Sequence, residues 1–136
     1  PCYVPFSINV FVPHPAIELS LEYFLGLLNS RVMWLWFQHN AKRRGVGLEI
    51  NGNVLRRAPI VHLNLNAAQD QEYHEKMIQL VRSMLHLFTN LQSATGHAAT
   101  AIRRQIDATD RRIDTLVYAL YGLTDEEIAV VEAATQ

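Results

Sequence analysis

The sequence predicts an α+β fold, in which a small, truncated β-sheet with covering helices is followed by a long antiparallel helical pair and a short C-terminal helix. Short runs of β-branched and aromatic residues at 8–12 and within 48–61 are typical of strands. Apolar residues recur every three to four positions through 71–91 and 102–120, as in amphipathic helices. A Gly-Leu-Thr joint at 122–124 then separates the last two predicted helices.

The predicted sheet takes its strands from two places in the first half of the chain. Residues 8–12 (INVFV) form one short strand. Residues 48–55 form a β-hairpin with a tight turn at Asn51-Gly52, because Asn-Gly suits two positions with positive φ. Residues 58–61 continue as an extended segment. Strands preceding Pro1 would be missing from this sheet, so we expect an exposed apolar edge that favours self-association.

Two helices are expected between these strands. The segment 18–28 carries an apolar stripe at helical spacing, made of Leu19, Tyr23, Phe24, Leu27 and Leu28. Ser30 is a suitable N-cap for a second helix that runs through Asn40, because its hydroxyl can accept an orphan backbone N–H. This second helix contains Trp34 and Trp36. We assign both tryptophans to the core, since paired tryptophans pack inside a protein more often than they bind a ligand.

The second half of the chain is predicted to be helical. Asp70 is the expected N-cap of a helix over 71–91, whose apolar stripe is Met77, Val81, Met84, Phe88 and Leu91. The segment 90–97 (NLQSATGH) lowers helix propensity, so we place a joint there, with Ser93 or Thr95 capping the next helix. Two amphipathic helices joined this way pack as an antiparallel pair. One continuous helix remains the alternative, because the heptad phase persists through the joint.

The stretch 102–131 holds the strongest local signals. A heptad stripe predicts one apolar seam, formed by Ile102, Ile106, Thr109, Ile113, Leu116 and Leu120. Charged residues fill the other faces: Arg103, Arg104, Asp107, Asp110, Arg111, Arg112 and Asp114. Gly122 should end the helix in a left-handed conformation. Thr124 and Glu127 have the spacing of a capping box, which predicts a terminal helix that folds back onto the long one.

The composition argues against a disulfide-bonded or membrane-spanning protein. The 136 residues include a single cysteine, Cys2, which excludes an internal disulfide and favours a reduced, cytoplasmic setting. No apolar run has the length of a membrane span, and no signal peptide is visible. The chain starts at Pro1 without a methionine, so we interpret it as a fragment of a longer protein.

Charge is unevenly distributed along the chain. Residues 1–66 hold six basic and three acidic residues, a net of +3, whereas residues 67–136 hold six basic and ten acidic residues, a net of −4. A nucleic-acid footprint, if there is one, therefore belongs to the first half. Ordinary scatter on a nearly neutral protein explains the same asymmetry.

The sequence shows no catalytic signature. There is no glycine-rich cofactor loop, no Asn-Pro-Pro-aromatic motif for methylating adenine, and no clustered Asp, Glu and Lys set for nuclease chemistry. The six histidines lack metal-ligand spacing with one another or with Cys2. Asp107, Asp110 and Asp114 lie on neighbouring helical turns, but the arginines between them favour a solvated salt-bridge face over a metal site. We expect a non-catalytic fragment with no metal and no bound cofactor.

Binding chemistry is concentrated in five basic residues. Lys42, Arg43 and Arg44 precede Gly45-Val46-Gly47 in what we predict is a flexible loop, and Arg56 and Arg57 lie on the expected hairpin. Arginine can bridge guanine O6 and N7, and both residue types neutralise phosphates. If Arg56 and Arg57 alternate along a strand, only one of them faces a ligand. Asn51 and Asn53 could read adenine edges, but turn formation accounts for both.

Residues 106–136 (IDATDRRIDTLVYALYGLTDEEIAVVEAATQ) resemble the C-terminal tail of type II restriction-modification DNA methyltransferases that modify adenine, with a TaqI-like specificity domain. Similar IDxLVYxLYGLT sequences occur in type I specificity subunits. Tyr118 and the run Leu120–Thr124 carry the likeness, and Ala119 departs from it where the family more often has Glu. Residues 22–37, followed by APIVHL at 58–63, resemble the recognition regions of the same enzymes more loosely.

The resemblance implies that residues 1–66 are a partial α/β target-recognition domain and residues 67–136 a helical spacer and docking region. The partners would be double-stranded DNA and the parent's methyltransferase or nuclease domain, which would bind S-adenosylmethionine. The DNA-binding residues would be Lys42, Arg43, Arg44, Arg56 and Arg57. A second hypothesis is an assembly module, in which the heptad helices pair with another chain or another copy and do not contact DNA.

Overall fold

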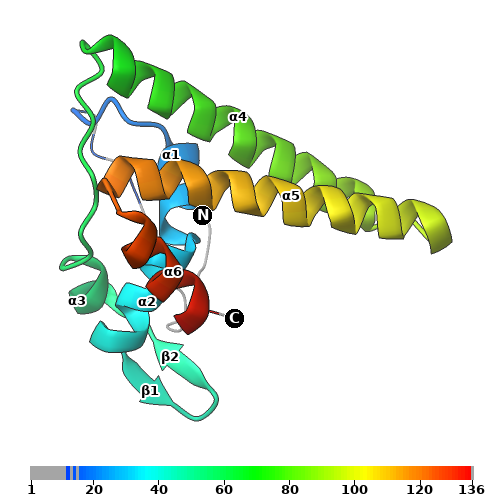
Figure 1. Ribbon diagram of the computed structural model, residues 1–136, viewed down its shortest axis with the longest axis horizontal. Coiled ribbons are helices and arrows are strands. Elements are labelled where there is room, and N and C mark those ends of the chain that lie inside the picture. The colour runs from blue at the N-terminus through cyan, green and yellow to red at the C-terminus, as the bar shows by residue number, and fades with distance from the viewer. Residues whose placement is uncertain (1–11, 13, 15, 136) are drawn as a thin grey trace, which may run out of the picture.

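The computed structural model describes residues 12, 14 and 16–135, and within them the predicted α+β class is confirmed (Figure 1). The elements follow in the order α1 (Leu21–Leu28), α2 (Arg31–Asn40), β1 (Lys42–Arg44), β2 (Gly47–Glu49), α3 (Gly52–Leu55), α4 (Ala68–Leu91), α5 (Gly96–Tyr121) and α6 (Asp125–Ala134). Helices α4 and α5 form the long antiparallel pair. The pair projects well beyond the shorter elements, and the β1–β2 hairpin projects in another direction.

The joint between α4 and α5 is a hairpin, so the alternative of one continuous helix is wrong. Thr95 is the N-cap residue of α5, one of the two positions expected, but its hydroxyl makes no capping bond. The predicted start of α4 is also wrong. The helix begins at Ala68, and Asp70 lies in its first turn, where its Oδ2 accepts the Asn64 N–H at 2.8 Å. Asp70 therefore anchors the incoming loop, and does not cap the helix.

Helices α1 and α2 both begin at a serine cap. The helix expected from residue 18 begins at Leu21, because the Ser20 Oγ accepts the Tyr23 N–H. The Ser20 N–H in turn donates a hydrogen bond to His74 Nε2 on α4, at 3.0 Å. Ser30 caps α2 as predicted, its Oγ accepting the Met33 N–H at 3.3 Å.

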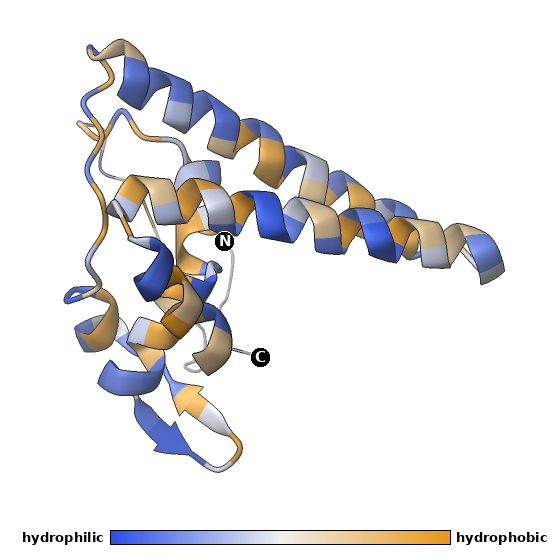
Figure 2. Cartoon of the chain, viewed as in Figure 1, coloured by the Kyte–Doolittle hydropathy of each residue, from blue (hydrophilic) through white to orange (hydrophobic). Residues whose placement is uncertain are grey.

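The core lies where α1, α2 and the inner halves of α4 and α5 meet (Figure 2). Its most deeply buried side chains come from all four helices and from both sides of residue 66: Tyr23, Leu27, Met33, Met77 and Val117. Gly26 on α1 lets the α1 backbone approach α4 closely, because a Cβ at this position would collide with Met77 and Val81. The absence of a side chain at Gly26 thus sets the spacing of these two helices.

Two tyrosine hydroxyls, from the buried Tyr23 and the half-buried Tyr121, tether the segment between α3 and α4. The Tyr23 hydroxyl donates to the Val61 carbonyl at 2.8 Å, and the Tyr121 hydroxyl donates to the Pro59 carbonyl at 2.6 Å. Burial raises the pKa of Tyr121 to about 12 and also raises the pKa of Tyr23, so both remain donors at neutral pH. Segment 58–61, predicted to be extended, belongs to no strand, and the Ile60 N–H donates to the Ala58 carbonyl at 2.8 Å in a tight turn around Pro59.

The predicted hairpin is displaced along the chain. The sheet of the described residues pairs 42–44 with 47–49, and the hairpin expected over 48–55 is wrong. Asn51 instead caps α3, because its Oδ1 accepts the backbone N–H groups of Asn53 and Val54 at 3.1 Å each. Most of the strand predicted at 8–12 lies outside the described residues, and Val12 is not in a strand.

The C-terminal joint forms as predicted. Gly122 has φ 62° and ψ 36°, and the Leu123 N–H donates to the Tyr118 carbonyl at 3.0 Å. Thr124 and Glu127 form the full capping box. Helix α6 differs from expectation in its neighbour, since it packs chiefly against α2 and not against the long helix α5. Val131 is its buried residue.

Replacing Gly122 by valine should lower the free energy of unfolding by about 1–2 kcal/mol, because a β-branched residue fits the left-handed region poorly. No neighbouring atom lies within 4 Å of a Cβ built at this glycine, so the cost comes from the backbone and not from a clash. Urea denaturation of the two proteins measures the difference. Gly122→Asn is the matched control and should lose less, since asparagine tolerates this conformation.

Candidate nucleic-acid interface

The three basic residues at 42–44 form a strand, so the expectation of a flexible loop is wrong. In the β1–β2 ribbon Lys42 is opposite Glu49, Arg43 opposite Leu48 and Arg44 opposite Gly47. The chain reverses at Gly45, which has φ 60°, followed by the fully exposed Val46. Figure 1 shows this ribbon extending beyond the end of α2. Lys42, Arg43 and Arg44 are all exposed along it.

The pleat divides the basic residues between the two faces of the ribbon. Successive side chains point to opposite faces, so Lys42 and Arg44 share a face with Glu49, and Arg43 lies on the other with Leu48. Arg44 and Glu49 form an exposed ion pair with a nitrogen–oxygen distance of 3.7 Å. An exposed pair at this distance contributes little to stability, so Arg44 can exchange it for a phosphate at low cost.

Arg56 and Arg57 follow the short helix α3, and the expectation that they lie on a strand is wrong. Arg57 Nη2 donates to the Asn40 carbonyl at 3.3 Å, which places this guanidinium beside the start of β1. The fold therefore brings Arg57 to the base of the ribbon although 13 positions separate it from Arg44. Arg56 is exposed at the end of α3, and the fold does not tie it to the ribbon in this way.

Trp34 is a candidate contact that the sequence analysis missed. We expected Trp34 in the core, yet 43% of its surface is exposed. It lines a hollow of about 220 Å³ between α2 and the ribbon with Gln38, Arg43 and Leu48 among the other walls. The buried residues of α2 are Met33 and Phe37, four apart, and Trp34 directly follows Met33, so helical spacing places it at the side of the buried face and not at its centre.

The ribbon lies in a stretch with almost no negative charge. Between residues 23 and 69 the sequence has six basic residues and one acid, Glu49. Arg31 is neutralised by Asp114, with a nitrogen–oxygen distance of 3.2 Å, which leaves Glu49 to offset the five predicted binding residues. Figure 2 shows the hydrophilic β1 strand at the exposed end of the molecule. The arrangement suits a polyanion, because opposite charge steers binding and pairs with phosphates.

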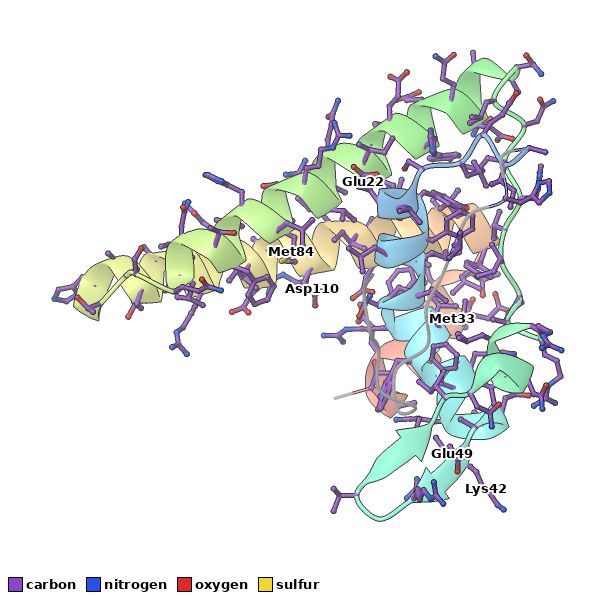
Figure 3. The ribbon with its side chains drawn as sticks, turned by 180° about the vertical axis from the view of Figure 1, so that it is seen from behind. Glu22, Met33, Lys42, Glu49, Met84 and Asp110 are labelled. Atoms are coloured by element: carbon purple, nitrogen blue, oxygen red, sulfur yellow. The ribbon has the colours of Figure 1, made fainter. Side chains whose placement is uncertain are left out.

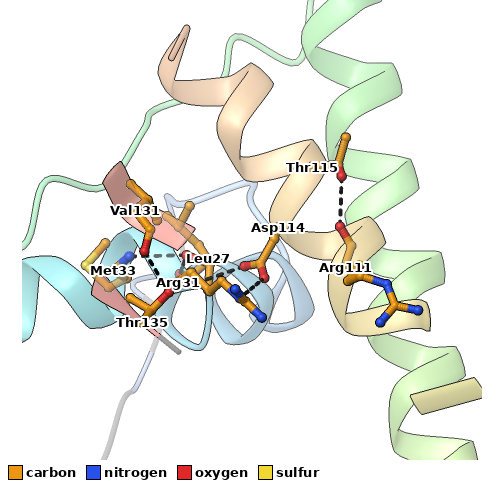
Figure 4. Close-up of polar contacts among 9 residues, drawn as sticks. Leu27, Arg31, Met33, Arg111, Asp114, Thr115, Val131 and Thr135 are labelled. Atoms are coloured by element: carbon orange, nitrogen blue, oxygen red, sulfur yellow. Dashed lines mark hydrogen bonds and ion pairs between the residues drawn. The ribbon is translucent and has the colours of Figure 1, made fainter. Parts of the chain in front are cut away.

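The Arg31–Asp114 ion pair joins α2 to α5 (Figure 4). The expectation that Asp114 lies on a solvated face is therefore wrong. Asp114 is buried, and its Oδ1 also accepts the Arg31 backbone N–H at 2.9 Å. Burial raises the pKa of the Asp114 carboxyl, although its bond from the Arg31 N–H and the Arg31 charge act in the opposite direction. The pair fixes the start of α2, the helix that leads into the ribbon.

The described residues contain no group of three or more His, Cys, Asp or Glu side chains that could hold a metal ion. Among them there is also no helix with the length and apolar character needed to cross a membrane. Comparison of the chain with protein-family models, with curated proteins and with solved structures gave no match. The chemistry that the described side chains offer at the ribbon is charge pairing, hydrogen bonding and aromatic stacking.

Proposed function

We propose that this chain binds double-stranded DNA through the β1–β2 ribbon and serves as the DNA-recognition part of a type II restriction enzyme or adenine-specific DNA methyltransferase. One observation carries the proposal: Lys42, Arg43 and Arg44 project on a two-stranded ribbon, residues 42–49, in which Glu49 is the one acidic residue. The sequence resemblance supplies the enzyme class, and the parent's catalytic domain would bind S-adenosylmethionine.

The shape of the ribbon supports a duplex over a single strand as the ligand. The major groove of B-DNA admits a two-stranded β-ribbon, whose side chains can then reach both phosphates and base edges. Lys42 and Arg44 lie on one face and Arg43 on the other, so the two faces could contact opposite walls of the groove. Arg57 at the base of the ribbon would pair with a backbone phosphate.

Replacing Lys42, Arg43 and Arg44 together by alanine should weaken DNA binding at least about tenfold and reduce the salt dependence of binding. Fluorescence titration of the 136-residue chain with labelled duplex at several salt concentrations measures both quantities. If all three residues contact phosphates, the slope of log K against log salt should fall by about 2–3, because each neutralised phosphate contributes about 0.9. Loss of affinity with an unchanged slope would assign the residues to base edges.

The matched control removes the same charge from the other half of the chain. Lys76, Arg111 and Arg112 are exposed on α4 and α5, and their triple alanine variant should bind DNA like the original protein. The proposal fails if the ribbon variant keeps both its affinity and its salt slope, or if the two variants lose affinity equally. Equal losses would indicate an effect of net charge alone.

The assembly-module hypothesis has support from a different observation. Leu85 and Phe88, on the outer half of α4, are each 50% exposed. A helical pair that projects from the body with large apolar side chains on its surface is typical of a docking element. This second function is compatible with DNA binding, because the ribbon and the outer half of the helical pair lie in different parts of the fold.

A further inference from the structure

An apolar groove lies where the helical pair leaves the body. It encloses about 460 Å³ and is lined mainly by carbon atoms of α1, α4 and α5, among them Leu25, Met84, Phe88 and Ile106. Figure 3 shows Met84 on α4 and Asp110 on α5 close to the point where the pair passes α1. Asp107 and Asp110 lie on the α5 wall of the groove, beside Ile106 and Ile113. The groove is therefore both apolar and acidic.

The outer end of the same helical pair has the opposite charge. From Ser83 to Ile106 the sequence contains no acidic residue and two arginines, Arg103 and Arg104. Leu85 and Phe88, which also line the groove, are exposed at the inner edge of this segment, and the α5 seam is less buried toward the tip, since Ile102 and Ile106 are only half-buried. The tip therefore presents apolar side chains together with positive charge.

Helical geometry places a positive residue and two negative residues on one face of α5. Arg103, Asp107 and Asp110 are separated by four and three positions, so they form a row along α5. The next residue of this row is Asp114, which pairs with Arg31 of the body. None of the ion pairs among the described side chains involves Asp107 or Asp110. Their charges are available to a partner.

We propose that the occupant of this groove is the helical tip of a second copy of the chain. Two pairs lying antiparallel would each place their tip in the groove of the other, with a two-fold axis near Ile106. Arg103 of each copy would then face Asp107 and Asp110 of the other, because Ile106 lies about midway between these positions. Phe88 and Leu85 of both copies would be covered. A two-fold interface requires such self-complementarity, and the tip and groove supply it in charge and in apolar surface.

The test is a charge exchange between two variants, followed by sedimentation equilibrium. The original chain should be a dimer, whereas the variant Arg103→Asp and the double variant Asp107→Arg/Asp110→Arg should each raise the dissociation constant about 100-fold, because like charges would then meet on both sides of the axis. An equimolar mixture of the two variants should restore a dimer, since every facing pair is again opposite in charge. Arg112→Asp is the control, because Arg112 lines a groove on another side of the pair and should leave the dimer intact.

Three outcomes would overturn the proposal. The original chain could remain monomeric over the accessible concentration range. Arg103→Asp and Asp107→Arg/Asp110→Arg could each remain a dimer. The mixture could fail to associate although each variant melts like a folded protein. None of these measurements involves DNA, so the dimer and the DNA-binding proposal stand or fall separately.

Discussion

Replacing Gly26 by valine is expected to lower the free energy of unfolding by about 2–3 kcal/mol, the cost of overpacking a well-filled core. A Cβ at this position would overlap the Met77 sulfur and lie 2.9 Å from a Val81 methyl. Met77 is fully buried and cannot move into solvent to make room. Valine is a better helix former than glycine, but that gain of a few tenths of a kcal/mol is much smaller than the clash.

Urea denaturation measures this loss, and a second substitution identifies its cause. Met77→Ala opens space beside Gly26, so the double variant should be more stable than the sum of the two single effects predicts, by about 1 kcal/mol or more. Gly47→Val is the matched control, because nothing lies within 4 Å of a Cβ there and its stability should change little. A fully additive double variant would contradict close contact between α1 and α4 as the reason for this glycine.

Replacing Asp114 by alanine is expected to cost a similar amount, about 2–3 kcal/mol, because it leaves two donors without their acceptor. The first donor is the Arg31 backbone N–H in the first turn of α2, and the second is the Arg31 guanidinium. The guanidinium is about one-third exposed, so water replaces part of what it loses. Asp110→Ala, one turn earlier on an exposed part of α5, is the control and should leave stability nearly unchanged.

The Asp114→Asn variant should lose less stability than Asp114→Ala, because the amide oxygen can still accept the Arg31 N–H. The difference in stability between the original protein and Asp114→Asn should also depend on pH. Burial raises the pKa of this carboxyl in the folded protein, so the carboxyl binds its proton more tightly when folded. The protonated Asp114 carboxyl therefore stabilises the fold below the ordinary aspartate pKa. This contribution is lost as pH rises through the raised pKa of the folded protein.

Urea denaturation of both proteins across that pH range measures the effect. The free energy of unfolding of the original protein, relative to that of Asp114→Asn, should be highest in acid and should fall toward neutral pH. A difference that instead grows in favour of aspartate as pH rises would mean that the Arg31 charge outweighs burial at this site.

Signals confined to a few neighbouring residues were predicted correctly from the sequence. The Ser30 cap, the left-handed Gly122 and the Thr124–Glu127 capping box each depend on groups within three or four positions of one another. The heptad seam of α5 likewise follows from spacing along one helix, with Thr109 and Ile113 buried as expected. The concentration of basic residues at 42–44 was visible because charge is a property of the sequence itself.

Some sequence patterns are compatible with two different local structures, and only the tertiary structure decided between them. Asn-Gly suits a tight turn and also a helix start, and Asn51 caps α3 in the folded chain. The hairpin turns instead at Gly45, so the predicted loop is a strand that gives the basic residues defined faces. Trp34 is apolar enough for a core, but Met33 and Phe37 already occupy the buried side of α2.

The sequence by itself therefore determined the longer helices, the caps at Ser30, Gly122 and Thr124, and the placement of charge, because these depend on spacing along the chain. Only the tertiary structure decided which charges are neutralised and which remain available. Asp114 and Arg31 are 83 positions apart, and no local pattern distinguishes this buried aspartate from the exposed Asp107 and Asp110 on the same helical row. The difference arises because α2 packs against the inner end of α5 and leaves its outer end uncovered.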